Sequence, residues 1–396
     1  EKRPRLRFPG FDEPWKAEKL SDFAERVTRK NTNNETSLPL TISSKDGLVD
    51  QISYFNKTVA SKNMSGYYLL KNGEYAYNKS YSVGYDFGSV KRLDRYDMGA
   101  LSTLYICFAL KKHDSDFIKA YFDSLKWYRE IYMISAEGAR NHGLLNVPTD
   151  EFFDTKHYIP QDLTEQRKIA NFMIALERRI MAQQSLVDNL KKYKRGLLNK
   201  VFSNTDEKIY PTVYLSEVAD FLQGLTYSPS DVANAGHLVL RSSNIQNGTL
   251  SFDDCVYVDK SIPESLQVKC ADVIMCVRNG SKSLVGKTAL IPIDMPKTTW
   301  GAFMMIVRSK LNDTYIFHYL NSQMFFSQVF KDTGTATINQ ITKGILNECR
   351  LPLPPVEERK KISKMLSTFD AKIYNAERTL YALMETRKAL LQQLFI

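Results

Sequence analysis

The sequence predicts an α+β protein in which two mixed α/β domains are separated by two long antiparallel helices that form a coiled coil, with a pseudo-two-fold internal repeat. Three observations support this prediction. A long segment occurs twice, both copies carry apolar residues at heptad spacing, and the stretches before the two copies share one layout. We therefore expect a first domain over residues 1–160, a long helix over 161–203, a second domain over 204–355 and a last helix over 356–396.

The repeated segment reads TEQRKIANFMIALERRI from Thr164 and EERKKISKMLSTFDAKI from Glu357. Shifting the first copy by 193 positions lays it on the second without a gap, so that Glu165 meets Glu358. Prolines precede both copies and acidic residues open them. This is a typical start for a helix, because the helix dipole favours negative charge in the first turn.

Steps of four and three residues along each copy follow one apolar stripe. We call this stripe the seam, and its apolar positions are Ile169, Met173, Leu176, Ile180, Val187, Leu190 and Leu197 in the first copy and Ile362, Leu366, Phe369, Ile373, Leu380, Leu383 and Leu390 in the second. Lys194 and Arg387 interrupt it at matching places. Either residue can lay its methylenes along the seam with the charge in water, or mark a site for another subunit.

A stripe on a helix of roughly 60 Å needs a partner. The other copy is the obvious one, although each stripe could instead pack on an ordinary globular core. The first helix leads away from the first domain and the second helix begins at the second domain, so helices that pair must run antiparallel. Two related modules on such a rod suit a partner with its own two-fold symmetry, such as duplex DNA.

The two stretches outside the helices share a layout more than they share letters. Each begins with an aromatic-proline stretch and a short Leu-Ser helix start, and then becomes strand-like. A Gly-Ala pair follows at Gly99 and at Gly301, leading into an apolar strand. One amphipathic helix is expected after each of these strands, around residues 116–134 and 314–330.

Composition narrows the function classes. The net charge is +10, and the repeated segments contribute most of it, +6 from residues 164–202 and +3 from residues 357–396. Charge therefore permits nucleic-acid binding without establishing it. No apolar run is long enough for a membrane span, and the first residues do not form a secretory signal. Five cysteines without a CxxC pair fit a reducing cytoplasm.

At this point a resemblance to a known family emerges. RFPGFDEPWKAEKLSDF, RSSNIQNGTLSFDD, VRNGSKSLVGKTALI, LPLPPVEERKKISKMLSTFDAKI and both helices resemble the DNA-specificity subunit of bacterial type I restriction–modification systems. The resemblance implies two target-recognition domains, each reading one half of a bipartite site in double-stranded DNA. It implies that the helices set the spacing and dock two methyltransferase subunits, which bring S-adenosylmethionine, and that two restriction subunits bring ATP and magnesium. This chain would bind no cofactor itself.

Motifs for chemistry are missing from the sequence. An adenine methyltransferase needs an Asn/Asp-Pro-Pro-aromatic stretch, and PLPP at residues 352–355 lacks the amide and the aromatic. GSKSLVGK at residues 280–287 has the wrong spacing for a phosphate loop. The five histidines show no metal-ligand pairing. We therefore expect neither catalytic residues nor a metal site in this chain.

Specific DNA readout uses Arg or Lys for guanine and Asn or Gln for adenine, carried on loops that enter the major groove. In the first domain the candidates are Asn78, Lys79, Ser80, Tyr81, Lys91, Arg92, Arg140, Asn141 and His142. In the second domain they are Arg241, Ser243, Asn244, Arg278, Asn279, Lys282, Thr335, Thr337, Asn339 and Gln340. Each can equally be a solvated loop residue or a turn former, and RSSNIQNG suggests a buried turn for Arg241 and Asn244.

Two functions from different classes remain open. The first is a non-catalytic DNA-specificity subunit in the cytoplasm. The second is a scaffold protein whose long helices assemble other proteins while the α/β domains bind protein or peptide. A self-contained modification enzyme is a third possibility, which the missing motifs disfavour.

Overall fold

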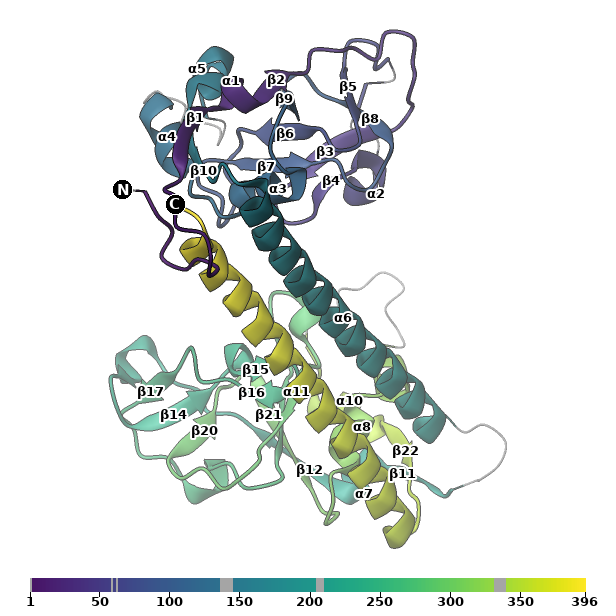
Figure 1. Cartoon of the computed structure of the whole chain (residues 1–396). Coiled ribbons are helices and arrows are strands. Elements are labelled where there is room, and N and C mark those ends of the chain that lie inside the picture. The colour runs from purple at the N-terminus through teal and green to yellow at the C-terminus, as the bar shows by residue number, and fades with distance from the viewer. Residues whose placement is uncertain (1, 58–59, 62, 136–144, 204–209, 331–339) are drawn as a thin grey trace. The chain divides into compact units, whose positions relative to one another are not determined.

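The computed structural model describes residues 2–57, 60–61, 63–135, 145–203, 210–330 and 340–396, and it divides into two compact units (Figure 1). The first unit comprises Glu1–Gln183 and Thr379–Ile396, and the second comprises Gln184–Arg378. Each unit therefore contains one sheet-bearing region together with part of both long helices. Among the described helices none is long and apolar enough to cross a membrane.

The first unit contains a two-stranded sheet, β1-β10, and two four-stranded sheets, β2-β9-β6-β7 and β4-β3-β8-β5. All of the strand pairs are antiparallel except β3 with β8. The strands are β1 (Lys16–Lys19), β2 (Ala24–Arg26), β3 (Pro39–Ser43), β4 (Gly47–Asp50), β5 (Tyr68–Lys71), β6 (Tyr75–Asn78), β7 (Ser89–Arg92), β8 (Met98–Leu101), β9 (Ile106–Leu110) and β10 (Lys156–Ile159). The helices are α1 (Leu20–Phe23), α2 (Gln51–Phe55), α3 (Ser115–Asp123), α4 (Tyr128–Ile134) and α5 (Thr149–Asp154).

The second unit repeats this pattern. Its two-stranded sheet is β11-β22, and its four-stranded sheets are β12-β21-β18-β19 and β13-β17-β14-β20, with a small β15-β16 hairpin in addition. The parallel pair is β14 with β20, in the place of β3 with β8. The strands are β11 (Thr212–Tyr214), β12 (Ala219–Gln223), β13 (Val232–Ala233), β14 (His237–Leu240), β15 (Ile245–Gln246), β16 (Thr249–Leu250), β17 (Val256–Val258), β18 (Val273–Cys276), β19 (Thr288–Leu290), β20 (Thr298–Trp300), β21 (Met304–Ser309) and β22 (Arg350–Pro352).

The helices of the second unit follow the same order. They are α7 (Leu215–Val218), α8 (Tyr315–Leu320), α9 (Gln323–Val329) and α10 (Lys343–Glu348), with short 3-10 turns at η2 (Pro229–Asp231), η3 (Ser242–Asn244), η4 (Glu264–Leu266) and η5 (Lys282–Leu284). The internal repeat expected from the sequence is confirmed by this shared topology. One difference is the outer strand of the second four-stranded sheet, which joins the parallel pair at β8 in the first unit and lies beyond β17 in the second.

Two long helices, α6 (Leu163–Phe202) and α11 (Val356–Leu394), carry the repeated segment (teal and yellow in Figure 1). In the first unit the start of α6 packs with the end of α11, through Ile169, Met173 and Leu391. In the second unit the end of α6 shares a core with the start of α11, through Leu198 and Leu366. The two helices are therefore antiparallel in both units, as the sequence predicts.

The expectation of one helix around residues 116–134, and of another around 314–330, was wrong. Each region holds two short helices. Leu125 interrupts the first with a left-handed backbone at φ 60°, which a leucine adopts only when its surroundings impose it. In the second, α8 ends at Leu320 and Ser322 caps the next helix by accepting from the Phe325 amide at 3.2 Å.

Candidate nucleic-acid interface

The same tight turn follows equivalent strands in the two units. After β6, the side-chain oxygen of Asn78 accepts a hydrogen bond from the Ser80 amide at 3.0 Å. After β18, the side-chain oxygen of Asn279 accepts from the Ser281 amide at 2.9 Å. Asn is suited to such turns because its short side chain substitutes for a backbone acceptor. The candidate clusters at residues 78–81 and 278–282 therefore follow equivalent strands, although their sequences differ. We call these two clusters the asparagine turns.

A second turn, which we call the serine turn, contacts each asparagine turn. It comprises residues 43–45 in the first unit and residues 242–244 in the second. Ser44, which follows β3, accepts a hydrogen bond from the Ser82 hydroxyl at 2.8 Å. Ser242, which follows β14, accepts from the Asn279 side-chain amide at 3.2 Å. Because β3 and β14 hold the same position beside a parallel neighbour, these contacts join the same two chain segments in both units.

A third segment returns to each asparagine turn. The Leu145 amide donates to the Lys79 carbonyl at 2.9 Å, and the Ile341 amide donates to the Val277 carbonyl at 2.7 Å. Gln340 also forms a β-bridge with Arg278. The remaining candidates lie outside the described residues; they are Arg140, Asn141, His142, Thr335, Thr337 and Asn339. The described residues that follow them in the chain nevertheless contact the two turns.

In the second unit the asparagine turn and the serine turn border a cavity of about 700 Å³. Its polar lining includes Arg241, Ser243 and Asn279, and its apolar lining includes Tyr227 and Phe303. The Arg278 guanidinium lies over the Phe303 ring, 5.3 Å from the ring centre. The structure thus brings together candidates from RSSN and VRNGSK, which are far apart in sequence.

The candidates of the second unit differ in whether their side chains already have ion-pair or hydrogen-bond partners within the fold. Arg241 pairs with Asp254 at 2.8 Å. Asn244 is fully buried, and its amide donates to the Ser251 and Asp254 carbonyls. Asn244 is therefore a turn former, which is the structural alternative left open above. Lys282 and Gln340 are exposed.

The candidates of the first unit divide in the same way. Tyr81 is 56% exposed, whereas Asn78, Lys79 and Ser80 are half-buried. Arg92 pairs with Asp94 at 2.6 Å and with Asp116 at 2.7 Å. Lys91 and Arg92 both form ion pairs within the fold, so Tyr81 is the most exposed of the described candidates in this unit.

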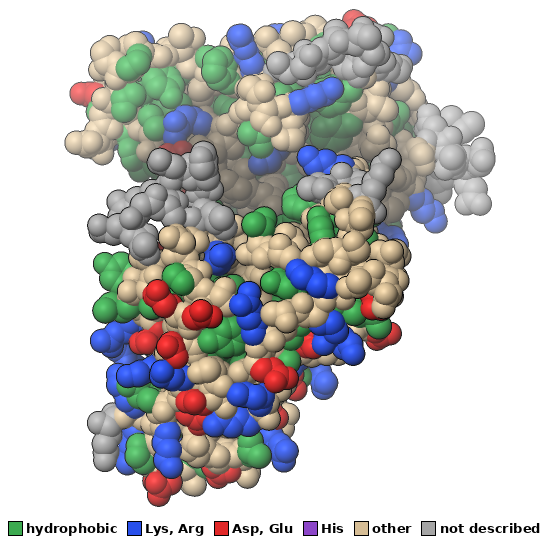
Figure 2. Space-filling model, turned by 90° about the horizontal axis from the view of Figure 1, so that it is seen from above, with side chains coloured by type: hydrophobic (Ala, Val, Ile, Leu, Met, Phe, Trp, Pro, Cys, Tyr) green, Lys and Arg blue, Asp and Glu red, His purple; other side chains and the backbone are tan. Residues whose placement is uncertain are grey.

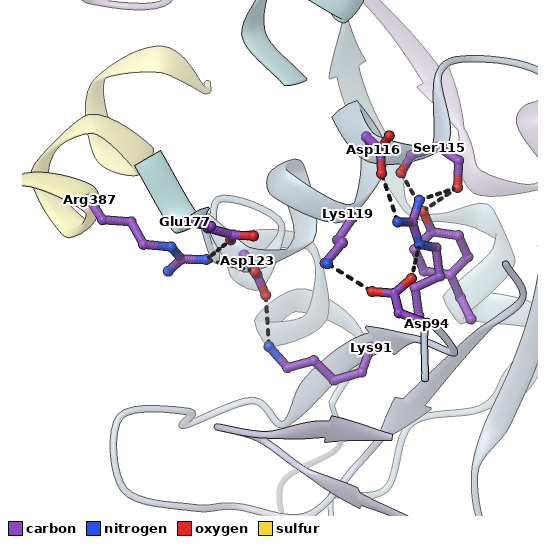
Figure 3. Close-up of polar contacts among 10 residues, drawn as sticks. Lys91, Asp94, Ser115, Asp116, Lys119, Asp123, Glu177 and Arg387 are labelled. Atoms are coloured by element: carbon purple, nitrogen blue, oxygen red, sulfur yellow. Dashed lines mark hydrogen bonds and ion pairs between the residues drawn. The ribbon is translucent and has the colours of Figure 1, made fainter. Parts of the chain in front are cut away.

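Lys91 belongs to an ion network that reaches the long helices (Figure 3). Its ammonium lies 2.7 Å from Asp123 at the end of α3. Arg387 of α11 contacts Asp123 at 2.9 Å and Glu177 of α6 at 2.8 Å. Burial by itself would raise the pKa of Asp123, but the Lys91 and Arg387 cations hold it below its ordinary value. The network therefore fastens the first sheet-bearing region to both helices.

The basic residues that interrupt the seam pair with acids on the opposite helix. Arg387 pairs with Glu177 in the first unit, and Lys194 pairs with Asp370 in the second. Glu177 and Asp370 are also related by the shift of 193 positions. Each interrupting basic residue is thus paired across the helices, and the repeat preserves both partners; in the second unit Lys191 also pairs with Glu377 at 2.7 Å.

All of the seam positions named from the sequence are covered. Ile169, Met173, Val187 and Leu366 are buried. The other positions are half-buried, namely Leu176, Ile180, Leu190, Leu197, Ile362, Phe369, Ile373, Leu380, Leu383 and Leu390. Large side chains off the seam stay exposed, among them Met181 at 71% and Tyr193 at 59%.

Charge does not single out an interface on the face that Figure 2 shows. Lys and Arg side chains are interspersed there with Asp and Glu, and hydrophobic side chains lie between them. A one-signed field is therefore not visible in this view, and the geometry of the turns locates the candidate site better than charge does.

Comparison with known proteins shows which proteins the chain is similar to. The family model for the type I restriction modification DNA specificity domain matches residues 210–384. The StySPI specificity subunit of Salmonella potsdam is 29% identical over 173 residues, which cover 41% of this chain and 37% of that protein. The MjaVIII specificity subunit of Methanocaldococcus jannaschii is 23% identical over 393 residues, covering 92% of this chain and 87% of that protein. The chain is similar to type I restriction–modification specificity subunits, and residues 210–384 match their DNA specificity domain.

Solved structures agree with the fold of this chain. The type I restriction–modification S subunit of M. genitalium matches with a TM-score of 0.60 at 16% identity, over 99% of both chains. A chain from a study of complex assembly in the type I system matches with a TM-score of 0.59 at 16% identity, over 97% of this chain and 98% of that chain. The sequence match to StySPI spans little more than a third of that relative's length, at 37%.

Sequence reasoning missed several residues of the candidate interface. Ser43, Ser44 and Lys45 form the serine turn of the first unit, and their signal was the Ser-Ser pair that also stands in RSSN. Phe303 and Tyr227 gave no signal, because only the fold brings them beside Arg278. Within the described residues no group of His, Cys, Asp and Glu is arranged to hold a metal ion.

Proposed function

We propose that this specificity subunit reads a bipartite site in double-stranded DNA, one half with each unit. The observation that carries the proposal is the convergence of three chain segments in each unit, namely the asparagine turn, the serine turn and the returning segment. Candidates for base contact sit on these segments beside side chains that hold the turns rigid. Rigid turns that carry exposed polar and aromatic groups suit insertion into a groove of DNA.

The long helices have a separate role in the proposal. They set the distance between the two half-sites and dock two methyltransferase subunits. Exposed large side chains off the seam support docking, since Met181, Tyr193 and Tyr374 are 71%, 59% and 47% exposed. S-adenosylmethionine, ATP and magnesium would be bound by partner subunits in the cytoplasm. The subunit itself would choose the sequence and catalyse no reaction.

A scaffold function is the competing proposal. In that case the sheet-bearing regions bind protein or peptide, and DNA affinity reflects only the net charge of +10. The ion pairs of Lys91 and Arg92 favour neither function, because they hold α3 in place in both cases. The cavity beside Arg278 favours DNA reading, because Arg and amide side chains converge there.

Selection from a pool of randomised duplexes separates the two functions. The full chain is reconstituted with its methyltransferase subunits, and bound duplexes are sequenced at about 100 mM salt, where non-specific phosphate contacts are weakened. We expect two short conserved elements separated by a spacer of fixed length. Enrichment of no sequence, together with a steep salt dependence, would favour the scaffold.

A further inference from the structure

The cavity of the second unit holds one guanidinium that the fold leaves unused. Arg241, Asp254 and Arg278 are the charged residues that line it. Arg241 and Asp254 neutralise each other at 2.8 Å. Among the described residues, the Arg278 side chain makes no ion pair, and its recorded partner is the Phe303 ring. Its five N–H donors are therefore available to a ligand.

The Arg278 backbone is held firmly although its side chain is exposed. Its amide donates to the Phe303 carbonyl at 3.2 Å, and the neighbouring Val277 amide donates to the same oxygen at 3.0 Å. Its carbonyl accepts from the Cys276 thiol at 3.7 Å, and the residue is bridged to Gln340. The backbone from which the side chain projects therefore does not have to be ordered when a ligand binds, and only the side-chain torsions do.

The Phe303 ring adds orientation to this rigid base. The ring is 59% exposed, and its face attracts the guanidinium that lies 5.3 Å from the ring centre. The planar fork of arginine carries paired N–H groups. Two parallel donors in one plane match the O6 and N7 acceptors of guanine in the major groove.

Two amide side chains in or near this cavity are used by the turns. Asn279 uses its amide on Ser242 and its oxygen on the Ser281 backbone. Asn244 is buried within its turn. The Ser243 hydroxyl and the Arg241 Nε are buried without a hydrogen-bond partner among the described residues, whereas Arg278 is exposed and presents a whole guanidinium that makes no ion pair there.

We propose that Arg278, stacked on Phe303, reads one guanine in the half-site bound by the second unit. This inference rests on the proposed function and deepens it, because it names a base and the side chain that selects it. Phe303 acts as a positioning residue, and Lys282, four positions away on η5 (Lys282–Leu284), supplies charge without base selection.

The test compares base preferences in the duplex selection, using the full chain with its methyltransferase subunits. Arg278→Ala and Arg278→Lys should both lose preference for guanine at one position by roughly 10- to 100-fold, leaving the other positions unchanged. Phe303→Leu should reduce the same preference in part. The lysine variant keeps the charge and loses the fork, so it separates base reading from phosphate contact.

Arg350→Ala is the matched control. Arg350 also stacks on an aromatic ring, that of Tyr214 at 4.7 Å, but it lies on β22 away from the cavity. We expect its selected site to equal that of the unaltered chain.

Three results would overturn the inference. They are an Arg278→Lys variant that retains the guanine preference, Arg278 variants that bind all duplexes uniformly more weakly, and Arg278 variants with unchanged selection. If the unaltered chain still selects a bipartite site in these cases, the inference about Arg278 is refuted and the proposed function is not. An unaltered chain that selects no sequence refutes both.

Discussion

Replacing Arg387 with methionine should loosen the first unit far more than replacing Lys194 with methionine loosens the second. Methionine keeps an apolar side chain of similar length in the seam and removes the charge. The two residues occupy the same place in the repeat. Their surroundings differ, and this difference sets the expected magnitudes.

Arg387 contacts two carboxylates at 2.9 and 2.8 Å, and the Asp123 side chain is only 13% exposed. Charge-assisted hydrogen bonds of this kind contribute about 1.5–3 kcal/mol each. Lys91 still neutralises Asp123 after the change, so we expect a net loss of about 2–3 kcal/mol. Among the described residues Lys194 makes its ion pair with Asp370, and their side chains are 15% and 36% exposed. Burial raises the pKa of Asp370, which weakens its charge, so we expect this single pair to contribute about 1 kcal/mol.

Hydrogen exchange followed by mass spectrometry reports on each unit by itself. A single free energy of global unfolding is not defined when the two units unfold separately. In Arg387→Met, amides of α3 should exchange roughly 30- to 150-fold faster, which is the expected loss converted at tenfold per 1.4 kcal/mol. In Lys194→Met, amides of α8 should change by no more than about fivefold. Equal and small effects in both units would refute the reasoning that burial of Asp123 makes the first network stronger.

Three further predictions address the helices, the turns and the response to acid. Gly196→Ala should stabilise the chain by about 1 kcal/mol, because a Cβ there meets no atom within 4 Å, and thermal melting would show no gain if the helix is strained at this point. Gly88→Ala should instead destabilise it, since φ is 77° and a Cβ would lie 2.0 Å from the Asn78 carbonyl oxygen; an unchanged melting temperature would count against this geometry. Burial lowers the pKa of His157 and of His318 to about 3, so the unfolded chain binds their protons first and stability should fall as pH drops from about 6.5 toward 3, by up to about 1.4 kcal/mol per pH unit for each histidine. His157→Phe should flatten that slope in the first unit, and a slope equal to that of the unaltered chain would contradict the assignment.

The helices could be predicted because their signal is local and periodic. The seam repeats every seven residues, and the structure covers every seam position. The break at Leu125 could not be predicted, because a leucine at positive φ results from the packing around it. The sequence also gave no sign that Arg92 pairs with Asp116, since their proximity depends on how α3 crosses β7.

The candidate interface was predictable only as a set of residue types. RSSN and VRNGSK were recognisable from the sequence as turns rich in Arg and Asn. Only the structure shows which of their side chains already have hydrogen-bond or ion-pair partners. Asn244 became a buried turn former, whereas Arg278 kept an exposed guanidinium. This separation depends on distant partners such as Asp254 and Phe303. The candidates at 140–142 and 335–339 stay predictions.

The most direct measurement of the central claim is hydroxyl-radical footprinting of the full chain with its selected duplex. Tyr81 in the first unit and Phe303 in the second are 56% and 59% exposed, and both should be protected when DNA binds. Tyr193 and Tyr374, which are 59% and 47% exposed on the long helices, should stay reactive with DNA alone. Protection of the helix tyrosines by DNA, with Tyr81 and Phe303 unchanged, would contradict the claim that each unit reads DNA through its asparagine turn.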